Sequence, residues 1–196
     1  MKFVPNAITI ARIVLTPILL VMMMSNTLFG LGGALVLFII AAITDYFDGK
    51  LARALGVRSR LGQFLDPFAD KVLVLGTFTA LAFLIPEIVP WWAVALIALR
   101  DVVVTVLRMW EESRGRTLRT VPMAKTKTTL QLIFLIGILV LLTAGKLRGA
   151  VAEAALWVLE SAIPFILLMV VVALTVFTGL WYLFNKEYVS PAQFNG

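Results

Sequence analysis

The sequence predicts an all-α integral membrane protein, and three observations carry this prediction. The chain is 61% hydrophobic and 14% charged, whereas soluble domains carry about 25% charged residues. Its mean hydropathy is positive, at +1.01. Six apolar stretches are each long enough for a bilayer-crossing helix, which needs about 20 residues. We therefore expect one transmembrane domain over residues 1–196, with six helices at 8–24, 31–53, 64–85, 90–112, 124–144 and 155–184.

Polar and helix-breaking residues separate these stretches, and the distribution of the basic residues indicates which ends of the helices face the cytoplasm. We expect turns on one side of the membrane at 25–27, 86–87 and 144–146. The other side holds the connections at 54–63 and 113–123 and both termini. Of the 17 basic residues, two lie on the first side, and eleven lie on the second: Lys2, Lys50, Arg53, Arg58, Arg60, Arg114, Arg116, Arg119, Lys125, Lys127 and Lys186. By the positive-inside rule, the second side and both termini are cytoplasmic.

The last apolar stretch is too long for a single crossing of the membrane. We expect Pro164 to kink it or to mark an interfacial start, because proline cannot continue a helix without losing a backbone hydrogen bond. Aromatic residues near the span ends are expected to be interfacial anchors: Trp91, Trp92, Trp110, Trp181 and Tyr182.

Composition excludes several kinds of chemistry. Cysteine and histidine are both absent, so there is no disulfide, no thiol nucleophile and no imidazole base. Proton transfer near neutral pH must fall to carboxylates, lysine or tyrosine. The net charge of +6 indicates anionic partners, and in a membrane protein these are lipid headgroups and phosphate-bearing substrates. Nucleic acid is disfavoured because the basic residues flank apolar spans.

Four of the five aspartates of the chain lie between residues 45 and 70. Asp45 and Asp48 are three apart and Asp66 and Asp70 are four apart, so each pair lies on one face of a helix. A carboxylate in hydrocarbon costs at least about 2.5 kcal/mol and needs a partner. Oxygen ligands without Cys or His suit Mg²⁺, Mn²⁺ or Ca²⁺, so we expect a pair of divalent metal ions. The alternative is four solvated aspartates, or ion pairs with Lys50, Arg53 and Lys71.

A second set of charged residues lies on the fourth and fifth expected helices. Arg100 and Arg108 are eight residues apart and so roughly on one face, while Lys125 and Lys127 open the next helix. Together these four cations could hold a phosphomonoester dianion. The alternatives are an ion pair of Arg100 with Asp101, snorkelling of Arg108 to the interface, and a basic flank at the fifth helix.

The aspartate segment resembles the signature of the CDP-alcohol phosphotransferases. It reads Asp-x-x-Asp-Gly-x-x-Ala-Arg from Asp45 to Arg53, then eight residues, then Gly-x-x-x-Asp-x-x-x-Asp from Gly62 to Asp70. The resemblance implies a six-helix membrane enzyme that binds two metal ions, with Mg²⁺ expected and Mn²⁺ possible. It also implies a homodimer, and transfer of a phosphatidyl-type group from a CDP-linked lipid to an alcohol with release of CMP. The metal ligands would be Asp45, Asp48, Asp66 and Asp70; the residues expected to bind the CDP-lipid are Asn6, Asp48, Gly49, Ala52, Arg53 and Gly62.

Two further segments resemble the bacterial phosphatidylglycerophosphate synthases of this family. One is Pro-Asn-x-x-Thr-x-x-Arg from Pro5 to Arg12, which would otherwise be a capped helix start with Arg12 snorkelling. The other is Arg100-Asp101 with Arg108 and the following Lys-x-Lys-Thr-x-x-Gln; at Asp101 the expected residue is more often Glu. This branch implies a bacterial inner-membrane enzyme that uses CDP-diacylglycerol and glycerol 3-phosphate.

The expected mechanism is a direct displacement assisted by two metals. Asp70 would act as general base on the 1-hydroxyl of glycerol 3-phosphate, while Arg100, Arg108, Lys125 and Lys127 would hold the acceptor phosphate. Two alternatives stay open. A cardiolipin synthase would use the same donor with another acceptor, and a cation transporter could also place four aspartates in a membrane.

Overall fold

The computed structural model describes residues 4–55, 60–114 and 122–184 of the chain, and the side chains of 12–44, 71–111, 113–114 and 126–184. Within these ranges every regular element is a helix. The helices are α1 (Val4–Met24), α2 (Leu28–Leu55), α3 (Arg60–Leu84), α4 (Trp91–Ser113), α5 (Pro122–Ala144), α6 (Ala150–Glu160) and α7 (Ile163–Phe184).

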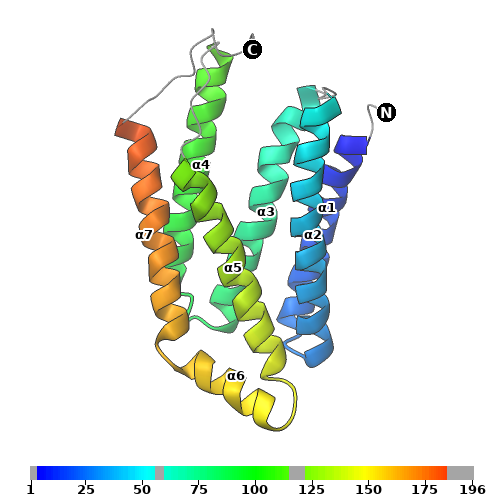
Figure 1. Cartoon of the computed structure of the whole chain (residues 1–196), viewed down its shortest axis with the longest axis vertical. Helices are drawn as coiled ribbons and strands as arrows, with labels where there is room; N and C mark the ends of the chain where they lie inside the picture. Colours follow the sequence, from blue (N-terminus) through cyan, green and yellow to red (C-terminus); the bar gives the residue numbers. More distant parts are fainter. Residues whose placement is uncertain (1–3, 56–59, 115–121, 185–196) are drawn as a thin grey trace.

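The six long helices lie alongside one another, and the short α6 crosses one end of the bundle (Figure 1). Helix α1 packs against α2 and α3, α5 against α2 and α7, and α4 against α3 and α7. The α1–α2, α3–α4 and α5–α6 connections lie at the same end (Figure 1). At the opposite end, α2 finishes, α3 begins, and α4 and α7 finish. Lys71 and Asp101 lie near the middle of α3 and α4, and Arg108 and Lys127 lie toward this second end.

The expected helices agree with the observed ones except at the C-terminal stretch. The expected spans 90–112 and 124–144 match α4 and α5 with ends within two residues. The stretch expected over 155–184 is divided into α6 and α7, which agrees with the interruption expected near Pro164 and not with one continuous span. Pro164 stands in the first turn of α7, where its missing N–H costs no helical hydrogen bond, so it suits the start of a new helix. The Ser161 N–H bonds the carbonyls of Trp157 and Val158 and so closes α6.

Two of the described segments are long and apolar enough to cross a membrane, Thr126–Ala144 and Ile163–Phe184. Three shorter apolar segments are Arg12–Met24, Leu28–Thr44 and Lys71–Leu84. Large apolar side chains point outward around the bundle; Val21, Phe29 and Phe83 are 71%, 88% and 65% exposed. Such a surface suits hydrocarbon, because contiguous apolar area of this kind is rare on soluble monomers. The count of six crossings remains a prediction.

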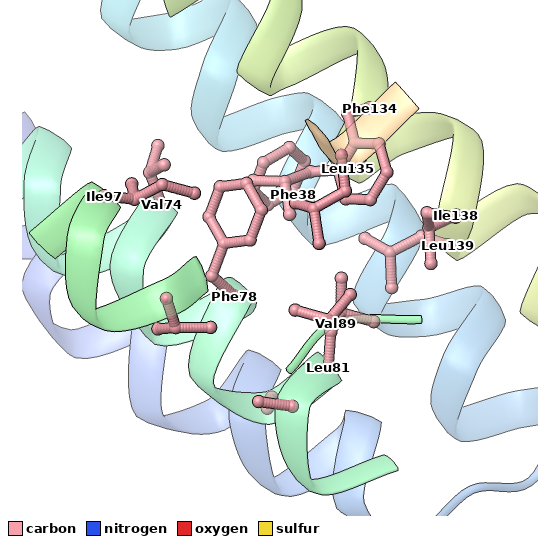
Figure 2. Packing of buried hydrophobic residues seen from close by; sticks show 14 of the residues in the cluster. Phe38, Val74, Phe78, Leu81, Val89, Ile97, Phe134, Leu135, Ile138 and Leu139 are labelled. Atoms are coloured by element: carbon pink, nitrogen blue, oxygen red, sulfur yellow. The ribbon is translucent and has the colours of Figure 1, made fainter. Parts of the chain in front are cut away.

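The core joins α2, α3, α4, α5 and α7 along the bundle axis. Figure 2 shows Phe38 of α2, Phe78 of α3 and Phe134 of α5 meeting at its centre. The rings of Phe78 and Phe134 stack with centroids 5.9 Å apart and an interplanar angle of 11°. Ile97 of α4 and Leu139 of α5 are fully buried in the same cluster. This apolar packing fixes α3, α4 and α5 relative to one another, and these three helices carry the candidate site.

Candidate active site

Helix α4 carries charged side chains into the interior of the bundle. The Asp101 side chain is 6% exposed and that of Arg100 is 10% exposed. The Thr105 hydroxyl bonds the Asp101 carbonyl at 2.6 Å, as is usual for threonine one turn along a helix. Charged side chains at such burial need partners, since an isolated buried charge costs several kcal/mol.

The Asp101 carboxylate has three cationic partners from three helices. Lys127 of α5 donates from Nζ to Oδ1 at 2.6 Å, and Arg100 donates from a terminal guanidinium nitrogen to the same oxygen at 3.1 Å. Lys71 of α3 lies with its Nζ 3.9 Å from Oδ2. We call these four residues the Asp101 cluster. It ties α3, α4 and α5 together at one point.

The Asp101 cluster has more positive than negative charge. Among the described side chains, three cations and one carboxylate make up the cluster, which is a formal charge of +2. The Lys127 side chain is 2% exposed, so its charge is screened little by solvent. A buried excess of positive charge attracts an anion, and an anion that brings two negative charges would balance the cluster.

The C-terminal helix supplies a second set of partners for the two arginines of α4. Arg100 donates to the Thr178 hydroxyl at 3.1 Å, and Arg108 donates to the Tyr182 hydroxyl at 2.6 Å. The Arg108 guanidinium carbon also lies 5.0 Å from the centroid of the Tyr182 ring, within the range of a cation–π contact. Thr178 and Tyr182 are four residues apart and therefore share one face of α7.

Three buried donors near these contacts have no hydrogen-bond partner among the described residues. They are Nε of Arg100, Nε of Arg108 and Nε2 of Gln131. Gln131 is 2% exposed and stands one helical turn after Lys127. An unsatisfied buried donor costs about 1–3 kcal/mol. An oxygen-rich ligand such as a phosphate group would satisfy donors of this kind, because each phosphate oxygen accepts several hydrogen bonds.

The structure brings together two of the four residues predicted to hold a phosphate, Arg100 and Lys127, and places Arg108 against the same neighbouring helix as Arg100. Arg100 and Lys127 meet at Asp101, and Arg100 and Arg108 both contact α7. The predicted alternative for Arg100, an ion pair with Asp101, is also present. Lys125 lies in the first turns of α5, and its side chain is outside the described residues.

Several residues of this site were not predicted in the roles that they have. Asp101 was expected only as a partner of Arg100, and it binds two lysines as well. Tyr182 was expected to be an interfacial anchor; this is wrong, because it is 2% exposed and bonds Arg108. Thr178 had no predicted role. Its signal in the sequence is weak, since threonine in an apolar helix more often bonds its own backbone.

The four motif aspartates lie at the same end of the bundle as this site. Asp45 and Asp48 are on α2, and Asp66 and Asp70 are on α3, so both pairs have the helical spacing that places them on one face. Their side chains are outside the described residues, so the predicted metal ligation is not tested. Within the described side chains, no group of three acidic residues could hold a metal ion. Lys71 directly follows Asp70 and belongs to the Asp101 cluster, so the backbone of the motif helix is joined to the cluster.

The residues predicted to bind the CDP-lipid also lie mostly outside the described side chains; these are Asn6, Asp48, Gly49, Ala52, Arg53 and Gly62. Arg12 of the N-terminal motif is described and is 5% exposed, buried in the bundle. The alternative of a snorkelling Arg12 is therefore wrong. The Arg12 carbonyl accepts from the Thr16 hydroxyl at 2.8 Å.

The described helices form an apolar bundle, and a buried cationic cluster lies beside the aspartate motif. This combination is typical of a membrane protein that binds anionic groups. The sequence profile of the CDP-alcohol phosphatidyltransferase family matches residues 2–181. The chain belongs to this family, whose members are membrane-bound and use divalent metal ions.

Curated relatives cover most of the chain. A Bacillus subtilis protein named CDP-diacylglycerol–glycerol-3-phosphate 3-phosphatidyltransferase is 34% identical, with 94% of each chain covered. A Mycobacterium tuberculosis protein named probable phosphatidylglycerophosphate synthase is 36% identical over 90% of this chain and 78% of its own length. An Escherichia coli protein that carries the same name as the Bacillus protein is 33% identical over 67% of this chain and 74% of its own length.

Proposed function

We propose that this protein transfers the phosphatidyl group of CDP-diacylglycerol to the 1-hydroxyl of sn-glycerol 3-phosphate, which gives phosphatidylglycerophosphate and CMP. The names of the three relatives support this reaction. The single structural observation that carries it is the Asp101 cluster, with its formal charge of +2, joined through Lys71 to the motif helix α3.

The chemistry of the acceptor explains why a cationic cluster is needed. The phosphate of glycerol 3-phosphate carries about two negative charges near neutral pH, as other phosphomonoesters do. Arg100, Arg108 and Lys127 would bind its oxygens by charge-assisted hydrogen bonds. An uncharged acceptor would leave the excess charge unbalanced, and phosphatidylglycerol, the acceptor of a cardiolipin synthase, brings a phosphodiester with a single charge. The cluster therefore favours a phosphomonoester acceptor over both.

The aspartate motif would bind and activate CDP-diacylglycerol, the donor of the phosphatidyl group. Four carboxylates on adjoining helix ends fit an oxygen-seeking divalent cation, and we propose that Asp45, Asp48, Asp66 and Asp70 hold two Mg²⁺ ions. Bound there, the ions would neutralise the diphosphate of the donor and the departing CMP. Gly49, Ala52 and Arg53, with Asn6 and Gly62, would line the site of the CDP-lipid.

The residues of the chain then have distinct roles in the displacement. Asp70 takes the proton from the 1-hydroxyl of the acceptor as that oxygen forms a bond to the lipid-linked phosphorus. The bond from this phosphorus to the oxygen bridging to CMP breaks, and CMP leaves. Arg100, Arg108 and the lysines hold the acceptor phosphate so that its hydroxyl faces the donor. Lys125, whose side chain is not described, would assist in holding this phosphate.

An acceptor panel tests this proposal. Purified protein in detergent with CDP-diacylglycerol and Mg²⁺ is offered glycerol 3-phosphate, inositol phosphate, serine or phosphatidylglycerol, and CMP release is followed. We expect turnover with glycerol 3-phosphate alone. Turnover with phosphatidylglycerol would favour a cardiolipin synthase, and Mg²⁺ flux in liposomes without CMP release would favour a transporter.

We further propose that the chain crosses a bacterial inner membrane six times, with both termini and the site on the cytoplasmic side, as a homodimer. The absence of cysteine makes the topology easy to test. A cysteine at Glu87, an exposed turn residue, should react with an impermeant maleimide added to intact cells, whereas one at Arg114 should not. The reverse pattern would invert the orientation. Light scattering should give twice the chain mass of 21.6 kDa.

A further inference from the structure

Helix α7 contacts both arginines of the candidate acceptor site, although no motif of the sequence falls on it. The face concerned consists of Thr178, Gly179 and Tyr182. All three are buried, and each is placed to limit the position of Arg100 or Arg108. None of the three carries a charge, so their contacts leave the formal charge of the Asp101 cluster unchanged.

The Thr178 hydroxyl is oriented so that its oxygen accepts a hydrogen bond from Arg100. Its hydroxyl donates to the carbonyl of Leu174 at 2.8 Å or of Thr175 at 3.1 Å, so its proton is already used within α7. A lone pair of the same oxygen accepts from Arg100 at 3.1 Å. With one terminal nitrogen bonded to Asp101 and the other to Thr178, the guanidinium plane of Arg100 is fixed, and its buried Nε has no partner among the described residues.

Gly179 leaves room for the stem of Arg100. A methyl group at residue 179 would lie 2.7 Å from Cγ of Arg100, well inside the usual carbon–carbon contact of about 3.5–4.0 Å. The position lies near the backbone end of the arginine, so the whole side chain would have to move. Glycine within a helix costs about 0.5–1 kcal/mol relative to alanine. The close approach of Arg100 gives a physical reason for glycine at this position.

Tyr182 constrains the second arginine one turn further along. Its hydroxyl accepts from Arg108 at 2.6 Å, and its ring faces the guanidinium at 5.0 Å. Arg108 thus has both a polar and an aromatic contact with one side chain. Thr178 and Tyr182 are four residues apart on α7. This step along α7 therefore sets the spacing at which the two guanidinium groups are held.

We propose that Thr178, Gly179 and Tyr182 of α7 are positioning residues that set the geometry of Arg100 and Arg108 toward the acceptor phosphate, and so determine affinity for a phosphomonoester acceptor. The inference rests on the proposed function of the site. It assigns to the C-terminal helix a share in acceptor specificity, in addition to packing.

Steady-state kinetics of matched variants test the proposal. Thr178→Val removes the hydroxyl and keeps the shape of the side chain, whereas Thr178→Ser keeps the hydroxyl. Thr175→Val is the control, because Thr175 is also buried in α7 and its hydroxyl donates to the Val171 carbonyl at 2.6 Å, with no contact to either arginine recorded among the described residues. Gly179→Ala is paired with Gly137→Ala of α5, where an added methyl meets nothing within 4 Å.

Thr178→Val should raise the KM for glycerol 3-phosphate about tenfold, as expected for loss of one hydrogen bond to a charged group. Gly179→Ala should raise the same KM, because the added methyl displaces the Arg100 side chain. The KM for CDP-diacylglycerol should not change. Thr178→Ser, Thr175→Val and Gly137→Ala should behave as the unmodified protein. Equal effects of Thr178→Val and Thr175→Val, or parallel changes in both KM values, would overturn the proposal.

The unmodified protein separates this inference from the proposed function. If it releases CMP with another phosphomonoester and not with glycerol 3-phosphate, the proposed function fails, and the variants are compared on that acceptor with the same expectation. If it releases CMP only with an uncharged acceptor, both the proposed function and the positioning role are wrong.

Discussion

Replacing Asp101 by Asn removes the carboxylate that, among the described side chains, joins α3, α4 and α5. The change keeps the size of the side chain but leaves Lys71, Arg100 and Lys127 without the counter-charge that lies 3.9, 3.1 and 2.6 Å from them. Removing one partner of a buried ion pair costs about 3–5 kcal/mol. For a chain of this size about 2–4 °C of melting temperature correspond to each kcal/mol, so the melting temperature should fall by at least about 6 °C.

The assay is thermal unfolding in detergent together with the KM for glycerol 3-phosphate. Asp101→Asn should lower the melting temperature and raise this KM, because Arg100 and Lys127, which bond the carboxylate, lose their positions. Asp101→Glu keeps the charge and should restore most of both properties. Glu153→Gln is the matched control, since it removes a carboxylate from the exposed face of α6. If Asp101→Asn and Glu153→Gln have the same stability and the same KM, the carboxylate does not organise the site.

Three further predictions follow from the proposed roles. Lys127→Met should raise the KM for glycerol 3-phosphate about 10- to 100-fold, as expected for loss of a charge-assisted hydrogen bond. The KM for CDP-diacylglycerol should stay unchanged, and equal changes in both KM values would argue for a structural role. Asp70→Asn should abolish CMP release while the variant still binds CDP-diacylglycerol in a filter assay; near-normal turnover would remove Asp70 as the base. Treatment with EDTA should stop CMP release and added Mg²⁺ should restore it, and activity that survives chelation would contradict the assignment of the four aspartates to metal ions.

Local sequence patterns were sufficient to predict most of the helices. Apolar stretches of about 20 residues have few structural alternatives to a helix, so α4 and α5 were predicted within two residues at each end. The C-terminal stretch was harder, because hydropathy alone does not distinguish one long helix from two. Pro164 signalled a disruption, but the division at Ser161 depends on backbone hydrogen bonds that close α6.

The site was predicted only in part, because a sequence shows the spacing along one helix but not the contacts between helices. Helical spacing placed Arg100 and Arg108 on one face, and both do contact α7. Spacing along one helix does not tell which residues of another helix meet it, and Thr178 and Tyr182 are separated from their arginines by 78 and 74 residues. The assignment of Tyr182 to the interface failed because an aromatic residue near a span end has the same pattern whether it faces lipid or a buried guanidinium.

The comparison of glycerol 3-phosphate with glycerol tests the central claim most directly. The two acceptors offer the same reacting hydroxyl, and only one carries the phosphate that the arginines and Lys127 would bind. Three charge-assisted bonds of about 1.5 kcal/mol or more each predict a ratio of kcat/KM of at least about 10³ in favour of glycerol 3-phosphate. A ratio near one, with CMP released from both, would contradict the account, because the buried cationic site would then have no part in recognising the acceptor.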